Sequence, residues 1–155
     1  MKLFTSKEEE YLTKQKICAI ATQQKDGELH VVPIRLHYNG KHMYVATHEK
    51  RKKIENMRDN GKVALLIGEF RSGTGSAEGV MVQGKVDMLP KGEEYLKAGE
   101  AIGLKRTGFN PKTKLWMYGP YKQFVLRISP KRKASWGINH PYRGGDQYSK
   151  TGVVD

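Results

Sequence analysis

The chain has 155 residues, a length that favours a single domain. Its 28 lysines and arginines exceed its 16 acidic residues, so its ligand or partner is expected to be anionic. A single cysteine, Cys18, excludes an intramolecular disulfide and a cysteine-based metal cluster. No apolar run is long enough to cross a bilayer and the N-terminus has no apolar signal core, so we expect a cytoplasmic protein.

The N-terminal part of the chain predicts a short helix followed by a strand. Ser6-Lys7-Glu8-Glu9 has the spacing of a capping box, which predicts a helix that runs to about Lys14. The apolar, β-rich residues Ile17–Gln23 predict a strand. Cys18 lies inside this strand with no neighbour that would activate it, so we expect a buried, inert thiol.

A hairpin and a basic helix form the centre of the chain. Asn39-Gly40 separates two extended runs, 28–38 and 41–47, and this dipeptide between β-rich runs is a strong hairpin signal. A helix is predicted over 49–58. Its first turn carries Lys50, Arg51, Lys52 and Lys53. Free amides and cations at a helix start favour an anion, so this corner is either a phosphate site or a solvated basic face.

The second half of the chain predicts further strands and one more helix. Gly84 is predicted to mark a bulge or a barrel corner. A helix is predicted over 90–103, because Pro90 can begin it and Gly103 can end it. The segments 71–79 and 105–114 are expected to be loops, and no periodicity follows Pro130. The strands cover Lys62–Gly68, Val80–Met88, Leu115–Tyr118 and Gln123–Ser129.

These elements favour a mainly β fold of six or seven strands with short flanking helices. Consecutive strands joined by two-residue turns are antiparallel, since parallel neighbours need a longer crossover, and many short strands indicate a barrel. No internal repeat or linker divides the chain. We therefore expect a single domain over 1–155, with its core at about 17–136 and an irregular tail over 137–155.

Several motifs follow one another in the order and spacing of a known family. They are His30-Val-Val-Pro-Ile-Arg35, Tyr44-Val-Ala-Thr47, Arg51-Lys-Lys53, Val63-Ala-Leu-Leu66, Gly79-Val-Met-Val-Gln-Gly84 and Ser135-Trp136. With this pattern the chain resembles the pyridoxamine 5′-phosphate oxidase-like split barrels over roughly Ile17 to Trp136. The resemblance implies an antiparallel Greek-key split barrel that binds FMN, or in some relatives the deazaflavin F420, at a homodimer interface.

The resemblance also implies which residues contact the cofactor. The family's contacts along its second strand fall on His30, Val31, Val32, Pro33, Ile34 and Arg35, and those at the end of its third strand fall on Ala46 and Thr47. Its phosphate-binding Arg-Lys pair matches Lys52-Lys53, with Arg51 beside it. Trp136 resembles a tryptophan that reaches the cofactor from near the C-terminus, and Arg143 is a looser match to an arginine after it.

The chain departs from the oxidase proper at three positions. His30 stands where the oxidase has an arginine, and Gly79 stands where it has a glutamine. The helix that holds the oxidase's substrate phosphate keeps Tyr95 but has Gly99 in place of an arginine. The resemblance therefore implies a flavoprotein of this superfamily with a substrate other than that of the oxidase.

Three functions remain open at this point. The chain is an FMN- or F420-dependent oxidoreductase of unknown substrate, a flavin- or F420-binding carrier or sensor, or a basic nucleic-acid-binding barrel. The third is least favoured, because the strands are mostly aliphatic and the cations are not interleaved with aromatics. No metal site is expected, since no ligand spacing relates His30, His37, His42 and His48.

The run of residues 28–38 also predicts the oligomeric state. Its side chains Val31, Val32, Ile34 and Leu36 supply two apolar faces, because successive side chains of a strand point to opposite sides. One face can fill the barrel, so the other requires a partner, and a two-fold homodimer is the commonest arrangement. Trp136 is either a contact to the cofactor ring or packing in the core or dimer interface.

Overall fold

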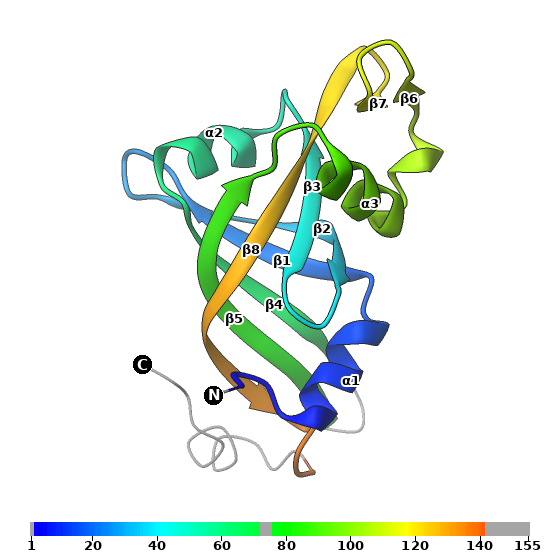
Figure 1. The fold of residues 1–155 in the computed structure, drawn as a ribbon. Coiled ribbons are helices and arrows are strands. Elements are labelled where there is room, and N and C mark those ends of the chain that lie inside the picture. Colours follow the sequence, from blue (N-terminus) through cyan, green and yellow to red (C-terminus); the bar gives the residue numbers. More distant parts are fainter. Residues whose placement is uncertain (1, 72–75, 142–155) are drawn as a thin grey trace.

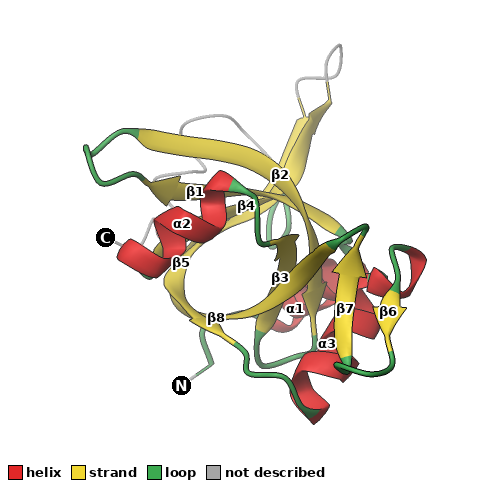
Figure 2. Ribbon diagram, turned by 90° about the horizontal axis from the view of Figure 1, so that it is seen from above, coloured by secondary structure: helices red, strands yellow, loops and turns green. Residues whose placement is uncertain are grey.

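Six antiparallel strands close into a barrel, as expected (Figures 1 and 2). In this computed structural model, residues 2–71 and 76–141 are described. The sheet order is β3-β2-β1-β4-β5-β8, and pairing of β3 with β8 closes the ring. These strands are β1 (Ile17–Gln23), β2 (Leu29–Tyr38), β3 (Met43–His48), β4 (Lys62–Arg71), β5 (Ser76–Met88) and β8 (Tyr121–Trp136).

Short helices and two further strands surround this barrel. They are α1 (Ser6–Lys14), α2 (Lys52–Asp59), α3 (Glu93–Ile102), the 3-10 turn η1 (Leu104–Arg106), β6 (Phe109–Asn110) and β7 (Leu115–Tyr118). Helix α1 lies at one end of the barrel and α2 at the other, while α3 lies outside, beside β2 and β3 (Figure 1). Strand β7 pairs with the start of β8 and extends beyond the barrel on the α2 side.

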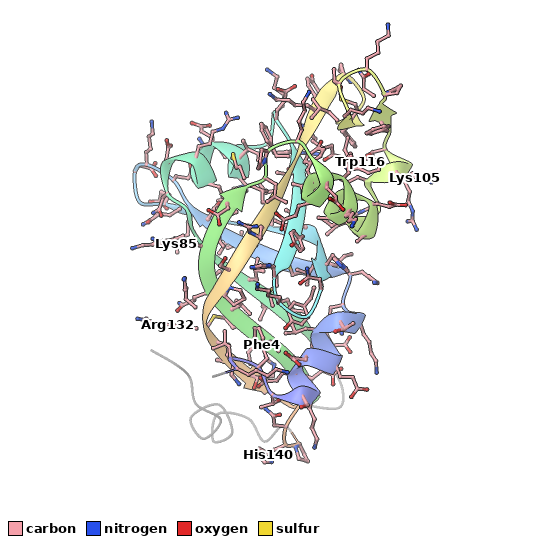
Figure 3. The ribbon with its side chains drawn as sticks, in the orientation of Figure 1. Phe4, Lys85, Lys105, Trp116, Arg132 and His140 are labelled. Carbon is pink, nitrogen blue, oxygen red and sulfur yellow. The ribbon has the colours of Figure 1, made fainter. Side chains whose placement is uncertain are left out.

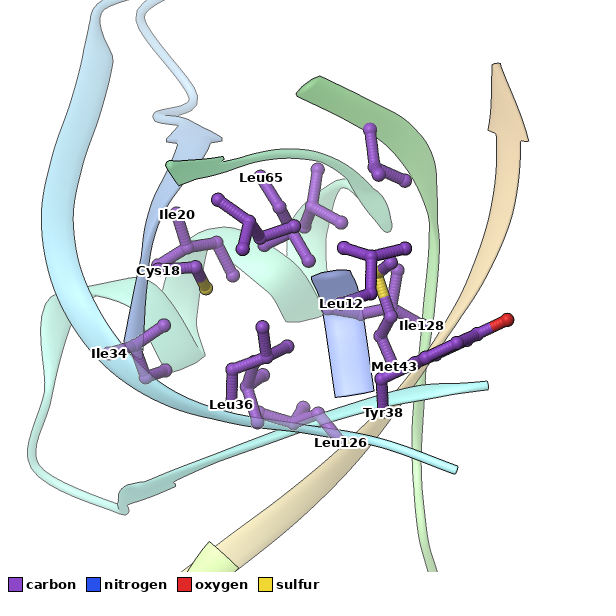
Figure 4. Packing of buried hydrophobic residues seen from close by; sticks show 14 of the residues in the cluster. Leu12, Cys18, Ile20, Ile34, Leu36, Tyr38, Met43, Leu65, Leu126 and Ile128 are labelled. Atoms are coloured by element: carbon purple, nitrogen blue, oxygen red, sulfur yellow. The ribbon is translucent and has the colours of Figure 1, made fainter. Parts of the chain in front are cut away.

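The barrel interior is filled by alternate residues of each strand. Ile20, Leu36 and Leu65 point inward and are almost fully buried, and Leu12 of α1 packs among them (Figure 4). Cys18 belongs to the same core, which confirms the expected burial, and burial raises the pKa of its thiol to about 12. The outward-facing residues of β1 and β2 do not fill this interior.

Local competition between side chains shifts some predicted boundaries. Helix α1 has the expected bounds, but its capping box is Thr5 with Glu8, one position before the predicted Ser6 with Glu9. The Asn39-Gly40 hairpin has a longer loop than a two-residue turn. The Asn39 Oδ1 atom accepts hydrogen bonds from the amides of Lys41 and His42, at 2.9 and 2.8 Å, so β3 begins only at Met43.

The predicted end of regular structure at Pro130 is wrong. Strand β8 continues to Trp136, because its second half pairs with β5 along a shifted register. Gly84 pairs with Pro130 and Gln83 pairs with Arg132, so Lys131 is an extra residue in β8. A proline has no amide to donate, which suits it to this irregularity. The bulge expected at Gly84 therefore exists, with its extra residue on the partner strand.

Other differences are confined to element ends and loops. Helix α2 starts at Lys52 and not at Glu49, because the Glu49 amide still donates to the Lys122 carbonyl in the barrel ladder, at 3.0 Å. The predicted loop 105–114 contains part of η1 and all of β6. The predicted loop 71–79 is wrong at both ends, since Arg71 still belongs to β4 and residues 76–79 already belong to β5, while 72–75 lie outside the described residues. The predicted tail, with Arg143, lies almost wholly outside the described residues.

Candidate functional site

A groove of about 490 Å³ lies where β2, the end of β3 and the start of α2 meet η1 and β7. It brings together most of the cofactor contacts expected from the sequence. Those that line it are Val32, Pro33, Ile34, Arg35, Ala46, Thr47, Arg51 and Lys53. No aspartate or glutamate lines the groove, whereas three cations do, so its electrostatics favour an anion.

The cations gather at the uncapped start of α2. Arg51 is the N-cap residue, and no side chain caps this helix end in the described structure. Desolvation, and then the positive charge of Arg51, lower the pKa of the half-buried Lys53 ammonium. Both features indicate a place where a bound anion would supply missing interactions. We call Arg51, Lys53 and the first amides of α2 the anion corner.

Lys52 does not belong to the anion corner. Its ammonium lies 3.3 Å from the Glu55 carboxylate on the exposed side of α2, and it does not line the groove. Consecutive helical residues point about 100° apart, and here Lys52 lies on the exposed side of α2 while Lys53 lines the groove. Of the three cations predicted as phosphate contacts, Arg51, Lys52 and Lys53, the structure thus brings Arg51 and Lys53 to the groove.

Three other predicted contacts lie away from the groove. His30 pairs with Thr22 across β1 and β2, and its Nδ1 atom has no hydrogen-bond partner among the described residues. Val31 is 62% exposed on the outer face of the barrel. Trp136 ends β8 next to α1, whereas the groove is at the α2 end (Figure 1).

Trp136 explains one of the departures from the family pattern. It pairs with Gly79, and a Cβ atom at Gly79 would lie 2.7 Å from the indole ring. A glutamine at this position would therefore displace the tryptophan. The neighbouring Ser135 points toward Glu8 of α1, so Trp136 points to the other, outer face of the sheet.

The groove also has walls that the sequence analysis missed. They are formed by Ile17, His48, Leu104, Thr107, Tyr118 and Gln123. The Gln123 amide donates to the Thr107 hydroxyl at 3.0 Å, which joins β8 to the turn after α3. Desolvation, followed by the charges of Arg51 and Lys53, lowers the pKa of the His48 imidazole. These residues come from distant segments, and no local pattern in the sequence relates them.

The two α3 positions that the resemblance matches to substrate-phosphate ligands are Tyr95 and Gly99. The Tyr95 hydroxyl donates to the Gln123 carbonyl at 2.9 Å and accepts from the Trp116 amide at 2.8 Å, and Tyr95 is only 2% exposed. Gly99 packs against Trp116, which lies beside α3 (Figure 3), and a Cβ atom at Gly99 would collide with the indole nitrogen. Both positions are therefore used for packing.

The groove opens at the edge of an apolar outer face. Among the described residues, six large apolar side chains are exposed, and four of them lie on this face. They are Ile17, Leu29, Val31 and Leu66, with exposed fractions from 47% to 72%. Register places Ala19 between Pro33 and Leu66, so small apolar residues fill the space between the larger ones. Ile17 belongs both to this outer face and to the groove.

No cluster of three or more histidine, cysteine, aspartate or glutamate side chains is placed to hold a metal ion in 2–71 and 76–141. Over the same residues, no helix has both the length and the apolar character needed to cross a membrane.

Comparison with known proteins adds a family match and several structural neighbours. The sequence model of the family described as pyridoxamine 5′-phosphate oxidase matches residues 4–126. No curated protein matches the chain.

Three solved structures share the fold at low sequence identity. A FAD-binding protein from Mesorhizobium loti is 24% identical, with a TM-score of 0.63 over 85% of this chain and 94% of its own. A protein described as F420 reductase is 19% identical, with a TM-score of 0.61 over 84% and 98%. The heme storage protein HutZ from Vibrio cholerae is 15% identical, with a TM-score of 0.64 over 85% and 92%.

Proposed function

The chain belongs to the pyridoxamine 5′-phosphate oxidase family, and from this premise we propose that it is a flavin-binding oxidoreductase. The groove holds FMN, or the FMN part of a larger flavin nucleotide. The observation that carries this proposal is the anion corner, where Arg51 and Lys53 converge at an uncapped helix start in a groove lined by no acid. A phosphate ester is the flavin group that such a corner recognises.

The remaining walls of the groove suit a flat, partly apolar ring. Val32, Pro33 and Ile34 form an apolar stretch of strand along the groove, and Pro33 has no backbone amide to donate a hydrogen bond. The buried Thr47 hydroxyl stands at the end of β3, between this strand and the anion corner. A bound flavin supplies the electron transfer itself, so the chain needs to bind, orient and shield it, with no acid–base dyad of its own.

The deazaflavin F420 is the second candidate cofactor. It also carries a phosphate near a flat ring, so the same anion corner can hold it, and a structural neighbour is described as F420 reductase. The packing of Tyr95 and Gly99 supports a substrate other than pyridoxamine phosphate with either cofactor.

Binding of flavins by the purified protein tests the proposal directly. FMN is expected to bind with a single dissociation constant, measured by calorimetry, and to give a protein-bound flavin absorbance spectrum. Riboflavin, which lacks the phosphate, should bind at least 100-fold more weakly, because two charged hydrogen bonds at about 1.5 kcal/mol or more are lost. Pyridoxamine phosphate should not reduce the bound flavin. Absence of binding by FMN, FAD and F420 would overturn the proposal.

We further propose that the working unit is a homodimer across the apolar outer face. Leaving Leu29, Val31 and Leu66 in water is unfavourable, and a two-fold copy would bury all three together with the open side of the groove. Trp136 lies on the outer side of the same sheet but at the opposite end from its own groove. A partner subunit could therefore bring its tryptophan to this groove.

A pair of charge substitutions on the outer face tests the dimer. The double variant Val31→Glu, Leu66→Glu is expected to sediment as a monomer, since burying each apolar side chain is worth about 1.5–3 kcal/mol and like charges would now meet across the axis. Flavin affinity should fall with it, because ligand and subunit contacts share one site. Phe109→Glu, at an exposed apolar residue of β6, is the control and should change neither the oligomeric state nor the flavin affinity. A wild-type monomer that binds flavin would contradict the dimer.

A further inference from the structure

Three aromatic rings stack beside the anion corner. The His48 ring lies 4.9 Å from the Tyr118 ring, with 9° between their planes, and 5.3 Å from the Tyr121 ring, with 18°. Tyr118 and Tyr121 pair across the turn that joins β7 to β8. We call this stack the aromatic shelf.

The aromatic shelf presents an open ring to the groove. Tyr118 is 47% exposed although it stacks on His48, and it lines the groove together with that histidine. The other exposed aromatic of this region, Phe109 of β6, packs on Trp116 and does not line the groove. Tyr118 is thus the exposed aromatic that a ligand in the groove can contact.

The shelf is held in place before any ligand binds. The His48 Nδ1 atom accepts a hydrogen bond from the Lys50 amide at 3.3 Å, which orients the imidazole at the end of β3. Tyr118 is held by the β7–β8 ladder. Because these groups are already ordered, a flat ring can stack on Tyr118 with little further loss of side-chain freedom.

The shelf and the anion corner are close enough to serve one ligand. Both line the same groove, and the charges of Arg51 and Lys53 act on the His48 imidazole. FMN ends at its phosphate, so with that phosphate at the anion corner the shelf would remain empty. FAD continues from the same position through a second phosphate to a flat aromatic base.

We propose that the aromatic shelf is an adenine subsite, so that the groove binds FAD more tightly than FMN. Three cations and no acid line the groove, so its positive charge can balance the negative charge of the diphosphate. An adenine stacks on a tyrosine through its ring face, which requires no specific hydrogen bond. F420 differs, because the chain beyond its phosphate carries carboxylates and no aromatic base. The inference rests on the proposed function, since the flavin half must first occupy the groove.

Calorimetric titration with FMN and with FAD tests the adenine subsite. The wild-type dissociation constant for FAD is expected to be about 10- to 100-fold below that for FMN, the range that stacking of one base on an aromatic ring provides. Tyr118→Ala should bring the two constants together by weakening FAD binding more than FMN binding. Tyr118→Phe, which keeps the ring, should retain the preference, and Phe109→Ala is the matched control that should leave both constants unchanged.

The outcomes separate this inference from the proposed function. The adenine subsite is overturned, while flavin binding stands, if FMN and FAD bind the wild-type protein equally. The same holds if Tyr118→Ala raises the dissociation constants for FMN and FAD by the same factor. If neither flavin binds, the proposed function fails and the subsite fails with it. Circular dichroism checks the fold of each variant, and the wild-type comparison of FMN with FAD still tests the inference if the alanine variant does not fold.

Discussion

Replacing Arg51 and Lys53 together by glutamate is expected to abolish flavin binding while the barrel still folds. These two cations line the groove at the start of α2, and no carboxylate lines the groove that could already neutralise them. Each charged hydrogen bond to a phosphate contributes about 1.5–3 kcal/mol, so losing two weakens binding by more than 100-fold. The new negative charges add repulsion to this loss. Calorimetry with FMN measures the effect, and circular dichroism checks the fold.

A second double variant with the same change in charge is the matched control. Lys50 and Lys52 belong to the same basic segment, but neither lines the groove, and Lys52 is paired with Glu55. Lys50→Glu, Lys52→Glu should therefore weaken FMN binding only a few-fold, and salt should screen that effect. Equal losses in the two double variants would mean that general charge, and not the anion corner, holds the phosphate.

Glu8→Gln is expected to lower the free energy of unfolding by about 3 kcal/mol. Glu8 is fully buried, and its carboxylate accepts hydrogen bonds from the Lys133 ammonium at 2.7 and 2.8 Å and from the Asn139 amide at 2.9 Å. The Ser135 hydroxyl donates to it as well. Removing one partner of a buried ion pair costs about 3–5 kcal/mol, and the lower value applies because 14% of the Lys133 side chain reaches water. Chemical denaturation measures the change.

The stabilisation by Glu8 should also depend on pH. Burial by itself raises the pKa of this carboxyl, but the hydrogen bonds from Lys133, Ser135 and its other donors outweigh burial, so the net pKa lies below its ordinary value of 4.5. A carboxyl with a lowered pKa in the folded state stabilises fully above the unfolded value and loses this stabilisation as the pH falls through the folded value. Wild type and Glu8→Gln should therefore differ most near neutral pH and converge in acid.

Glu10→Gln provides the control for Glu8. Glu10 lies on the same helix, but its ion pair with Lys14 is 70% exposed on both sides, so its loss should change stability by less than about 0.5 kcal/mol. A Glu8→Gln variant that is as stable as Glu10→Gln at neutral pH would show that the buried network contributes nothing to folding.

Much of the fold could be predicted from the sequence, because its signals are local. The strands Ile17–Gln23 and Leu115–Tyr118 have their predicted bounds, since β-rich runs end there at turn residues. Gly103 ends α3 in the left-handed conformation that glycine favours, at a φ of 97°. The order of motifs also predicted the family and the antiparallel barrel. The homodimer, the cofactor and the individual contacts to it remain predictions.

The site was only partly predictable, because tertiary structure decides which side chains meet. Lys52 and Lys53 are adjacent in sequence, yet helix geometry turns one to solvent and the other to the groove. The shelf of His48 and Tyr118 forms because β3 and β7 both neighbour β8. Glu8 meets Lys133 across 125 positions because β8 continues past Pro130. The last two contacts depend on long-range strand pairing, which local sequence patterns do not encode.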